Sequence, residues 1–156
     1  MGFQQSERVV ELNARVQAFM EEHIYPREHD WEEFTLDQNN LWETPPWFDG
    51  IREKAKEEGL WNLFLPAEYK PWSPGLSNVE IAPIFETMSK VRWAQPVFNC
   101  SAPDRGNMEV LAKYGTAEQQ KQWLEPLLAG EIRSAYAMTE PQVASSDATN
   151  MELEIK

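Results

Sequence analysis

The sequence predicts a mainly α fold. We expect a helical bundle domain over residues 1–130, with orthogonal or up-and-down helices, followed by the first strands of a β-domain over residues 131–156. Three observations support this prediction. Apolar residues recur at helical spacing through most of the first 130 residues. Two capping boxes mark helix starts, and beyond them the pattern changes to the alternation typical of strands.

The composition is that of an acidic globular protein. Hydrophobic residues make up 42% of the 156 residues, and the net charge is -12. A chain this acidic is unsuited to sequence-independent nucleic-acid binding, and no apolar run is long enough to span a membrane. The single Cys excludes an intramolecular disulfide and a cysteine-rich zinc site. No secretory signal pattern is present, so we expect an intracellular protein.

The first helix is predicted to follow Ser6 and to stop near Pro26, because proline disrupts a helix interior. Its apolar face is formed by side chains at helical spacing, namely Val9, Leu12, Val16, Phe19, Met20 and Ile24. The next stretch, residues 26–46, is polar and aperiodic but contains Trp31. We interpret it as a surface crossover held in place by its aromatic side chains.

Three further helices follow from local signals. A helix is expected after Pro46, ending at Gly59, since glycine suits the position just past a helix. The capping box Ser77-Asn78-Val79-Glu80 opens another helix, in which Pro83 predicts a kink or a late start. Residues 96–114 are predicted to be a helix interrupted around residues 101–104.

The last helix is predicted to start at a second capping box, Thr116-Ala117-Glu118-Gln119, and to end at Gly130. Residues 132–139 then have the pattern of a strand, residues 140–149 that of a loop, and residues 150–156 that of a second strand. Two strands alone rarely form a stable sheet, so we interpret residues 131–156 as the opening of a β-domain.

Three ordered motifs resemble the acyl-CoA dehydrogenase family. The run YAMTEPQVASSDATN, from Tyr136 to Asn150, resembles the family signature in which a strand leads into T-E-P, a small-residue turn and S-D. LPAEYKPWSPGLSNVEIAPIFETMSK and KYGTAEQQKQWLEPLLAGE resemble two earlier family segments in the same order. The TEPxVASSD form is similar to the branch of large members that includes kinase-like-domain fusions. The usual turn is one residue shorter and has Gly where this chain has Ala144.

The resemblance implies the fold and the chemistry of that family. Residues 131–156 would begin a β-barrel-like middle domain. The implied reaction of this oxidoreductase is α,β-dehydrogenation of an acyl-CoA thioester, in fatty acid β-oxidation and lipid metabolism. A carboxylate removes the α-proton while the β-hydrogen passes as hydride to N5 of FAD. The cofactor-binding residues implied for this flavoprotein are Tyr136, Ala137, Met138, Thr139 and Ser145.

The substrate-binding residues implied by the resemblance are Ser146, Ser145 and Phe98. Ser146 matches the family serine that contacts the CoA portion, and Phe98 lies where the acyl tail passes, near small residues such as Cys100 and Gly106. No catalytic residue is assigned in this chain, because the family's base comes from a C-terminal domain. We therefore expect a fragment that is inactive alone, and we assign Glu140 a structural role.

Other reactive residues have simpler interpretations. His23 and His29 lie among acidic residues without a specific ligand spacing, so no metal site is predicted. Cys100 is interpreted as a small buried residue. An alternative function is a non-catalytic helical interaction module, or a truncated remnant of the same fold. The retained Tyr136–Asp147 run favours the enzyme, since a scaffold does not need a Thr-Glu-Pro loop.

The resemblance also implies partners and a compartment. The partners are an acyl-CoA substrate and an electron-transferring flavoprotein or another acceptor, and the full-length form is expected to be a homo-oligomer. The compartment is cytoplasmic in a bacterium, and mitochondrial or peroxisomal in a eukaryote. Acyl chain length cannot be inferred from these residues.

Overall fold

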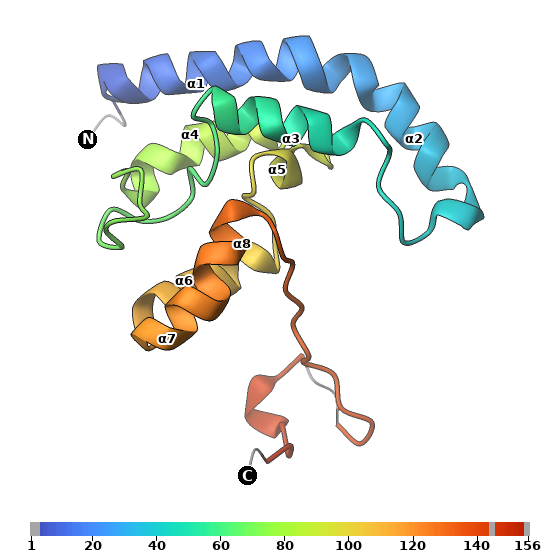
Figure 1. The fold of residues 1–156 in the computed structure, drawn as a ribbon, viewed down its shortest axis with the longest axis vertical. Coiled ribbons are helices and arrows are strands. Elements are labelled where there is room, and N and C mark those ends of the chain that lie inside the picture. The colour runs from blue at the N-terminus through green and yellow to red at the C-terminus, as the bar shows by residue number, and fades with distance from the viewer. Residues whose placement is uncertain (1–3, 144–145, 155–156) are drawn as a thin grey trace.

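The computed structural model describes residues 4–143 and 146–154, and it confirms a mainly α fold (Figure 1). In chain order the elements are α1 (Glu7–Phe19), the π-turn η1 (Met20–Ile24), the 3₁₀ turn η2 (Tyr25–Arg27), α2 (Glu28–Leu36), η3 (Gln38–Asn40), α3 (Phe48–Glu57), α4 (Asn78–Met88), α5 (Ala94–Val97), α6 (Asp104–Tyr114), α7 (Ala117–Gln119), the π-turn η4 (Gln120–Leu124), α8 (Glu125–Ala129) and η5 (Ala148–Asn150).

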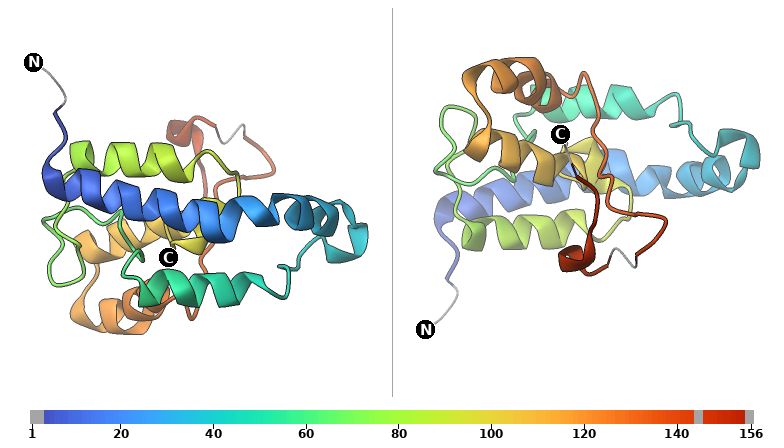
Figure 2. Two further views of the ribbon diagram at one scale, coloured as in Figure 1. Left: turned by 90° about the horizontal axis from the view of Figure 1, so that it is seen from above. Right: turned by 90° about the horizontal axis from the view of Figure 1, so that it is seen from below.

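The helices form two groups, visible in Figures 1 and 2. α1, α3, α4 and α5 lie together, and α6, α7 and α8 pack beneath them. After α8 the chain runs away from the helices as an extended segment. No helix among the described residues has the length and apolar character needed to cross a bilayer.

The first helical stretch, α1 with η1, ends at Ile24, so the prediction of a stop near Pro26 is confirmed. The aperiodic crossover predicted for residues 26–46 is wrong at its start, where η2 and α2 lie. The Tyr25 N–H donates to the Met20 carbonyl, five residues back, which makes the turn before the proline a wide π-turn. Pro26 then lies in the first turn of η2, where its missing N–H removes no helical hydrogen bond.

The same arrangement recurs at Pro126. The Glu125 N–H donates to the Gln120 carbonyl, again five residues back and directly before a proline. Pro126 then lies in the first turn of α8. A π-turn therefore precedes both prolines, and a further helical element follows each π-turn, η2 at Pro26 and α8 at Pro126.

The predicted helix starts at the capping boxes are confirmed. Ser77 and Glu80 form a reciprocal box at the start of α4, and Thr116 and Gln119 form one at the start of α7. α4 begins directly at its box and continues through Pro83 rather than starting late. Pro83 costs α4 one backbone hydrogen bond, because proline has no N–H to donate to the carbonyl in the first turn.

One core connects the two groups of helices. Its largest fully buried side chains include Phe64, Phe98, Met20 and Ile24. An aromatic cluster closes one end, where Trp31 of α2 stacks on Trp93 with ring centroids 5.0 Å apart. The expectation that aromatic side chains hold residues 26–46 in place is therefore met at Trp31. Further along this stretch the side chains of Leu36, Leu41 and Trp42 are exposed instead.

Neither predicted strand forms in the described chain. Residues 132–139 and 151–154 have no regular secondary structure, and residues 155–156 lie outside the described range. A strand needs a neighbour to satisfy its N–H and C=O groups, and these two segments do not pair within the described residues. The start of a β-domain, and the division at residue 130, stay predictions.

Candidate functional site

The four described residues predicted to bind the cofactor lie on the extended segment after α8 (Figure 1). Tyr136 is 70% exposed and Met138 is 36% exposed, and Ala137 and Thr139 are exposed as well. Within the described part of the chain, the backbone groups of residues 136–139 form no hydrogen bond. These N–H and C=O groups can bond either a neighbouring strand or the polar edge of a ligand, and the Thr139 hydroxyl can also donate or accept.

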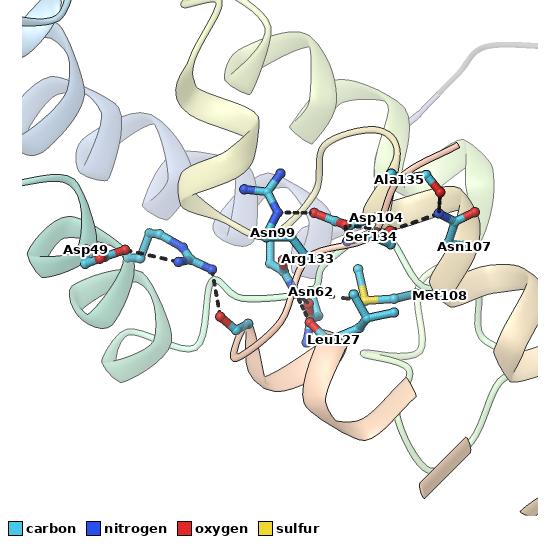
Figure 3. Close-up of polar contacts among 12 residues, drawn as sticks. Asp49, Asn62, Asn99, Asp104, Asn107, Met108, Leu127, Arg133, Ser134 and Ala135 are labelled. Atoms are coloured by element: carbon cyan, nitrogen blue, oxygen red, sulfur yellow. Dashed lines mark hydrogen bonds and ion pairs between the residues drawn. The ribbon is translucent and has the colours of Figure 1, made fainter. Parts of the chain in front are cut away.

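The root of this segment, residues 133–135, is held by a buried carboxylate, that of Asp104 at the start of α6 (Figure 3). Its side chain is 4% exposed and receives an ion pair from Arg133 at Oδ2. Oδ1 accepts from the Ser134 N–H at 2.7 Å and from the Ser134 hydroxyl at 2.6 Å. Two consecutive residues of the extended segment therefore satisfy one buried carboxylate.

Asn107, one turn further along α6, completes this contact. Its Nδ2 donates to the Ser134 hydroxyl oxygen at 2.9 Å and to the Ala135 carbonyl at 3.5 Å (Figure 3). The Ser134 hydroxyl thus accepts from Asn107 and donates to Asp104. We call Asp104, Asn107, Arg133 and Ser134 the α6 clamp.

The direction in which the segment leaves α8 depends on Gly130. Its φ is +74°, a left-handed conformation that glycine adopts readily. Its carbonyl accepts from Arg52 at 3.4 Å, and Arg52 lies over the ring of Trp61 at 5.2 Å. Trp61 in turn donates from Nε1 to the Leu128 carbonyl at 2.7 Å. Arg52 and Trp61 therefore brace the end of α8 just before the clamp.

The loop after the segment is closed by two carboxylates. Glu140 accepts from the backbone N–H groups of Glu152 and Leu153 at 3.0 and 3.1 Å, which suits a structural role. Asp147 accepts from the hydroxyl and the N–H of Thr149. These bonds hold the pKa of Asp147 below its ordinary value, and the hydroxyl has the larger effect. Ser146 is exposed beside Asp147, whereas Ser145 and Ala144 lie outside the described residues.

Phe98 takes a different position from the other predicted site residues. It is fully buried, and its ring packs 5.2 Å from that of Phe19 in the helical core. Its neighbour Cys100 is buried too, and burial raises the pKa of that thiol to about 12. Gly106 on α6 faces open space, because a Cβ placed there would meet no atom within 4 Å. Gly106 is exposed at the surface of α6, whereas Phe98 and Cys100 belong to the core.

A pocket of about 350 Å³ lies beside the clamp. It is lined by α6, by η4 and α8, and by the root of the extended segment, through Asn107, Val110, Leu111, Trp123, Leu127, Ile132, Arg133, Ser134 and Ala135. A second pocket, of about 610 Å³, lies between the N-terminal ends of α1 and α4, away from the extended segment (Figure 1). We take the first pocket as the candidate site, because Ser134 and Ala135 line it and residues 136–139 follow them directly in the chain.

The clamp was not predicted from the sequence. Ser134 was placed only in a small-residue strand, and Asp104 only in a helix interruption. The one available signal was the Pro103-Asp104 dipeptide, which marks a helix start and says nothing of a contact thirty residues away.

Comparisons with known proteins agree on one family. Residues 6–131 match the model for the acyl-CoA dehydrogenase N-terminal domain. Human acyl-CoA dehydrogenase family member 11 is 51% identical and aligns with 99% of this chain and 20% of its own length. Mouse acyl-CoA dehydrogenase family member 10 is 49% identical and aligns with 97% of this chain and 14% of its own length.

A solved structure gives the same result. A Mycobacterium abscessus protein described as an acyl-CoA dehydrogenase has a TM-score of 0.85 and 48% sequence identity. The match covers 96% of this chain and 38% of that protein. The chain therefore spans a fifth or less of the two mammalian relatives and under two fifths of the solved relative.

Proposed function

Because this chain belongs to the acyl-CoA dehydrogenase family, we propose that it is the N-terminal part of a flavin-dependent enzyme that dehydrogenates an acyl-CoA thioester. The observation that supports the proposal most directly is the extended segment at residues 136–139. It leads directly into the T-E-P motif at residues 139–141, and its backbone groups form no hydrogen bond within the described residues.

The chain's own residues have three roles in this proposal. The backbone of residues 136–139 and the hydroxyl of Thr139 bond the polar edge of the flavin, favouring negative charge on the reduced ring. Ser146, with Ser145, contacts the CoA portion of the substrate. Phe98 supports the wall of the acyl pocket from inside the core. When bound, FAD supplies the hydride acceptor for the β-hydrogen.

The proposal also places the base outside this chain. Glu140 is the carboxylate of the T-E-P motif itself, and its two oxygens accept from the backbone at residues 152 and 153. A general base has to reach the proton that it removes. The relatives are several times longer than this chain, and we propose that the base lies in a part of the enzyme that this chain does not include, so the chain alone is expected to be inactive.

The remaining roles follow from the family. An electron-transferring flavoprotein or another acceptor reoxidises the flavin, and the complete enzyme is a homo-oligomer. It works in fatty acid β-oxidation, inside a bacterial cell or in a eukaryotic mitochondrion or peroxisome. No acyl chain length is proposed.

The experiment is an intact mass and a visible spectrum of the polypeptide purified from its natural source. We expect a mass above 18.1 kDa, flavin absorption bands, and bleaching of those bands when acyl-CoA is added without oxygen. A colourless 18.1 kDa protein that takes up no FAD would overturn the proposal and favour an interaction module or a remnant.

A matched pair of variants sharpens this test. Thr139→Val keeps the side-chain shape and removes the hydroxyl, so bleaching by acyl-CoA should be slower. Thr35→Val is the control, because the Thr35 hydroxyl bonds only within its own helix, to the Trp31 and Glu32 carbonyls. Equal bleaching rates in the two variants would remove Thr139 from the flavin site.

A further inference from the structure

The α6 clamp joins α6 to the start of the extended segment, residues 133–135. Asp104 is almost fully buried, and all of its acceptor contacts come from Arg133 and Ser134. A buried carboxylate is costly unless it is hydrogen bonded and paired. Here the pairing and the hydrogen bonds are both supplied by the root of the extended segment. If the segment left α6, the Asp104 carboxylate would lose its ion pair with Arg133 and both hydrogen bonds from Ser134.

The clamp holds the backbone as well as the side chains. Asp104 accepts from the N–H of Ser134, and Asn107 donates to the carbonyl of Ala135. Fixing one N–H and the next residue's C=O sets both the register and the rotation of the chain at this point. A slip by one residue would place Arg133 or Ala135 where the Ser134 hydroxyl now bonds, and neither side chain carries a hydroxyl.

The clamp lies directly before the proposed flavin-binding residues. Tyr136 is two residues beyond Ser134, and Thr139 is five residues beyond it. An extended chain rises roughly 3.3 Å per residue, so Thr139 stays within about 17 Å of the clamp. Residues 136–139 form no other hydrogen bond within the described chain, so the clamp is the nearest fixed point for them.

We propose that Asp104, acting through Ser134 and Asn107, is a positioning residue that sets how residues 136–139 meet the flavin. The inference rests on the proposed function, because it assumes that those residues bind the flavin edge. It adds a specific dependence: a buried carboxylate on α6 controls flavin electronics through the segment that it holds. A purely structural clamp would affect only the stability of the protein.

The first measurement concerns the clamp without reference to flavin. Hydrogen exchange is followed at the Ser134 amide of the complete natural polypeptide, in the wild type and in the Asp104→Ala and Ser134→Ala variants. Loss of a hydrogen bond to a charged group should speed exchange in Asp104→Ala by about ten- to hundredfold. Ser134→Ala is the milder variant, since it keeps the amide bond and loses the hydroxyl. An unprotected Ser134 amide in the wild type overturns the inference.

The second measurement distinguishes positioning from stability. The flavin midpoint potential should become more negative in both variants, and kcat should fall by up to about a hundredfold with a smaller change in KM. Ser134→Thr keeps the hydroxyl and should restore both values. Thr87→Val is the control for stability, because the buried Thr87 hydroxyl links α4 to Asn13 of α1 at 2.8 Å, far from the clamp.

The outcomes separate the two proposals. A wild-type protein with flavin whose potential is unchanged in Asp104→Ala and Ser134→Ala overturns the inference and leaves the proposed function intact. A shift of the same size in Thr87→Val also overturns it, since general destabilisation would then be the cause. A wild-type protein without flavin overturns the proposed function and this inference with it, while the exchange data still report whether the clamp forms.

Discussion

Asn62 and Asn99 both have left-handed backbone conformations, with φ of 57° and 54°, and their side-chain amides are hydrogen bonded to each other. Asn99 Nδ2 donates to Asn62 Oδ1 at 2.7 Å and to the Leu127 carbonyl at 3.0 Å (Figure 3). Asn62 Nδ2 donates to the Leu128 carbonyl at 2.8 Å. The pair therefore joins the turn after α3 and the end of α5 to α8, which precedes the candidate site.

Replacing Asn99 should destabilise the fold strongly. Asn99→Ala removes two hydrogen bonds, leaves the buried Leu127 carbonyl without this donor, and places alanine in a left-handed conformation. We expect a loss of about 2–4 kcal/mol in the free energy of unfolding, measured by urea denaturation. Asn99→Gly keeps the backbone conformation accessible and should lose about 1 kcal/mol less. Equal losses in the two variants would show that backbone strain contributes nothing here.

Gly130 should tolerate no side chain. A Cβ at this position would lie 2.6 Å from the Arg52 guanidinium and 2.7 Å from the Trp61 ring, and φ is +74°. Gly130→Ala is expected to cost about 1–3 kcal/mol by thermal or chemical unfolding. Gly50→Ala is the matched control, because a Cβ there meets no atom within 4 Å and alanine favours a helix by about 1 kcal/mol. A stable Gly130→Ala protein would contradict this account of α8.

The two capping boxes should differ in their response to pH. The N–H and hydroxyl of Ser77 donate to Glu80, with smaller contributions from Ser6 and Arg8, and together they lower the pKa of Glu80 from its ordinary 4.5. A lowered pKa in the folded state stabilises the protein above the unfolded-state pKa, and this contribution is lost as the pH falls through the folded-state pKa.

We therefore expect Glu80→Ala to lower the melting temperature at pH 7 and to lower it less as the pH falls below 4.5. Gln119→Ala removes the equivalent residue of the second box, which does not titrate, so its effect should stay constant. Melting temperatures of both variants and the wild type, compared between neutral and acid pH, check this. A Glu80→Ala effect that is equally constant would contradict the role of the charged carboxylate.

Cys100 should be unreactive in the folded protein. Its side chain is 1% exposed and its Sγ lies 3.2 Å from the Phe98 carbonyl. Burial raises the pKa of the thiol to about 12, so almost no thiolate is present at pH 8. Labelling by a thiol reagent should be negligible in native buffer and complete in denaturant. Rapid labelling of the native protein would place Cys100 at the surface.

Much of the helical structure was predictable because its signals are local. A capping box acts over three residues, and Gly59, with φ of 67°, ends a helix through its own backbone preference. The helix α2 after Pro26 was missed, because its residues lack a periodic apolar face and none of them is buried. Pro26 and Pro126 each follow a π-turn, in which the residue before the proline donates to a carbonyl five residues back.

Part of the candidate site was likewise predicted from the sequence and part of it was not. The T-E-P motif and Ser146 were identified from residues adjacent in sequence, and with them the family was recognised. Residues 132–139 were predicted to be a strand with small residues on both faces, and residues 150–156 were predicted to be a strand from their alternation. Residues 133–139 and 151–154 are unpaired in the described chain. Alternation reports which side chains suit a sheet, whereas a strand forms only when a neighbour satisfies its backbone.

The sequence by itself determined the helical class, the starts of α4 and α7, the acidic character and the family, since each depends on residue identity and short spacing. Only the tertiary structure decided that Asp104 meets Ser134 and that Asn62 meets Asn99. These residues are 30 and 37 positions apart, and their side chains carry no mark of a partner. Their contact depends on the packing of α8 against α6 and on the turn at Gly130, so it exists only once the chain has folded.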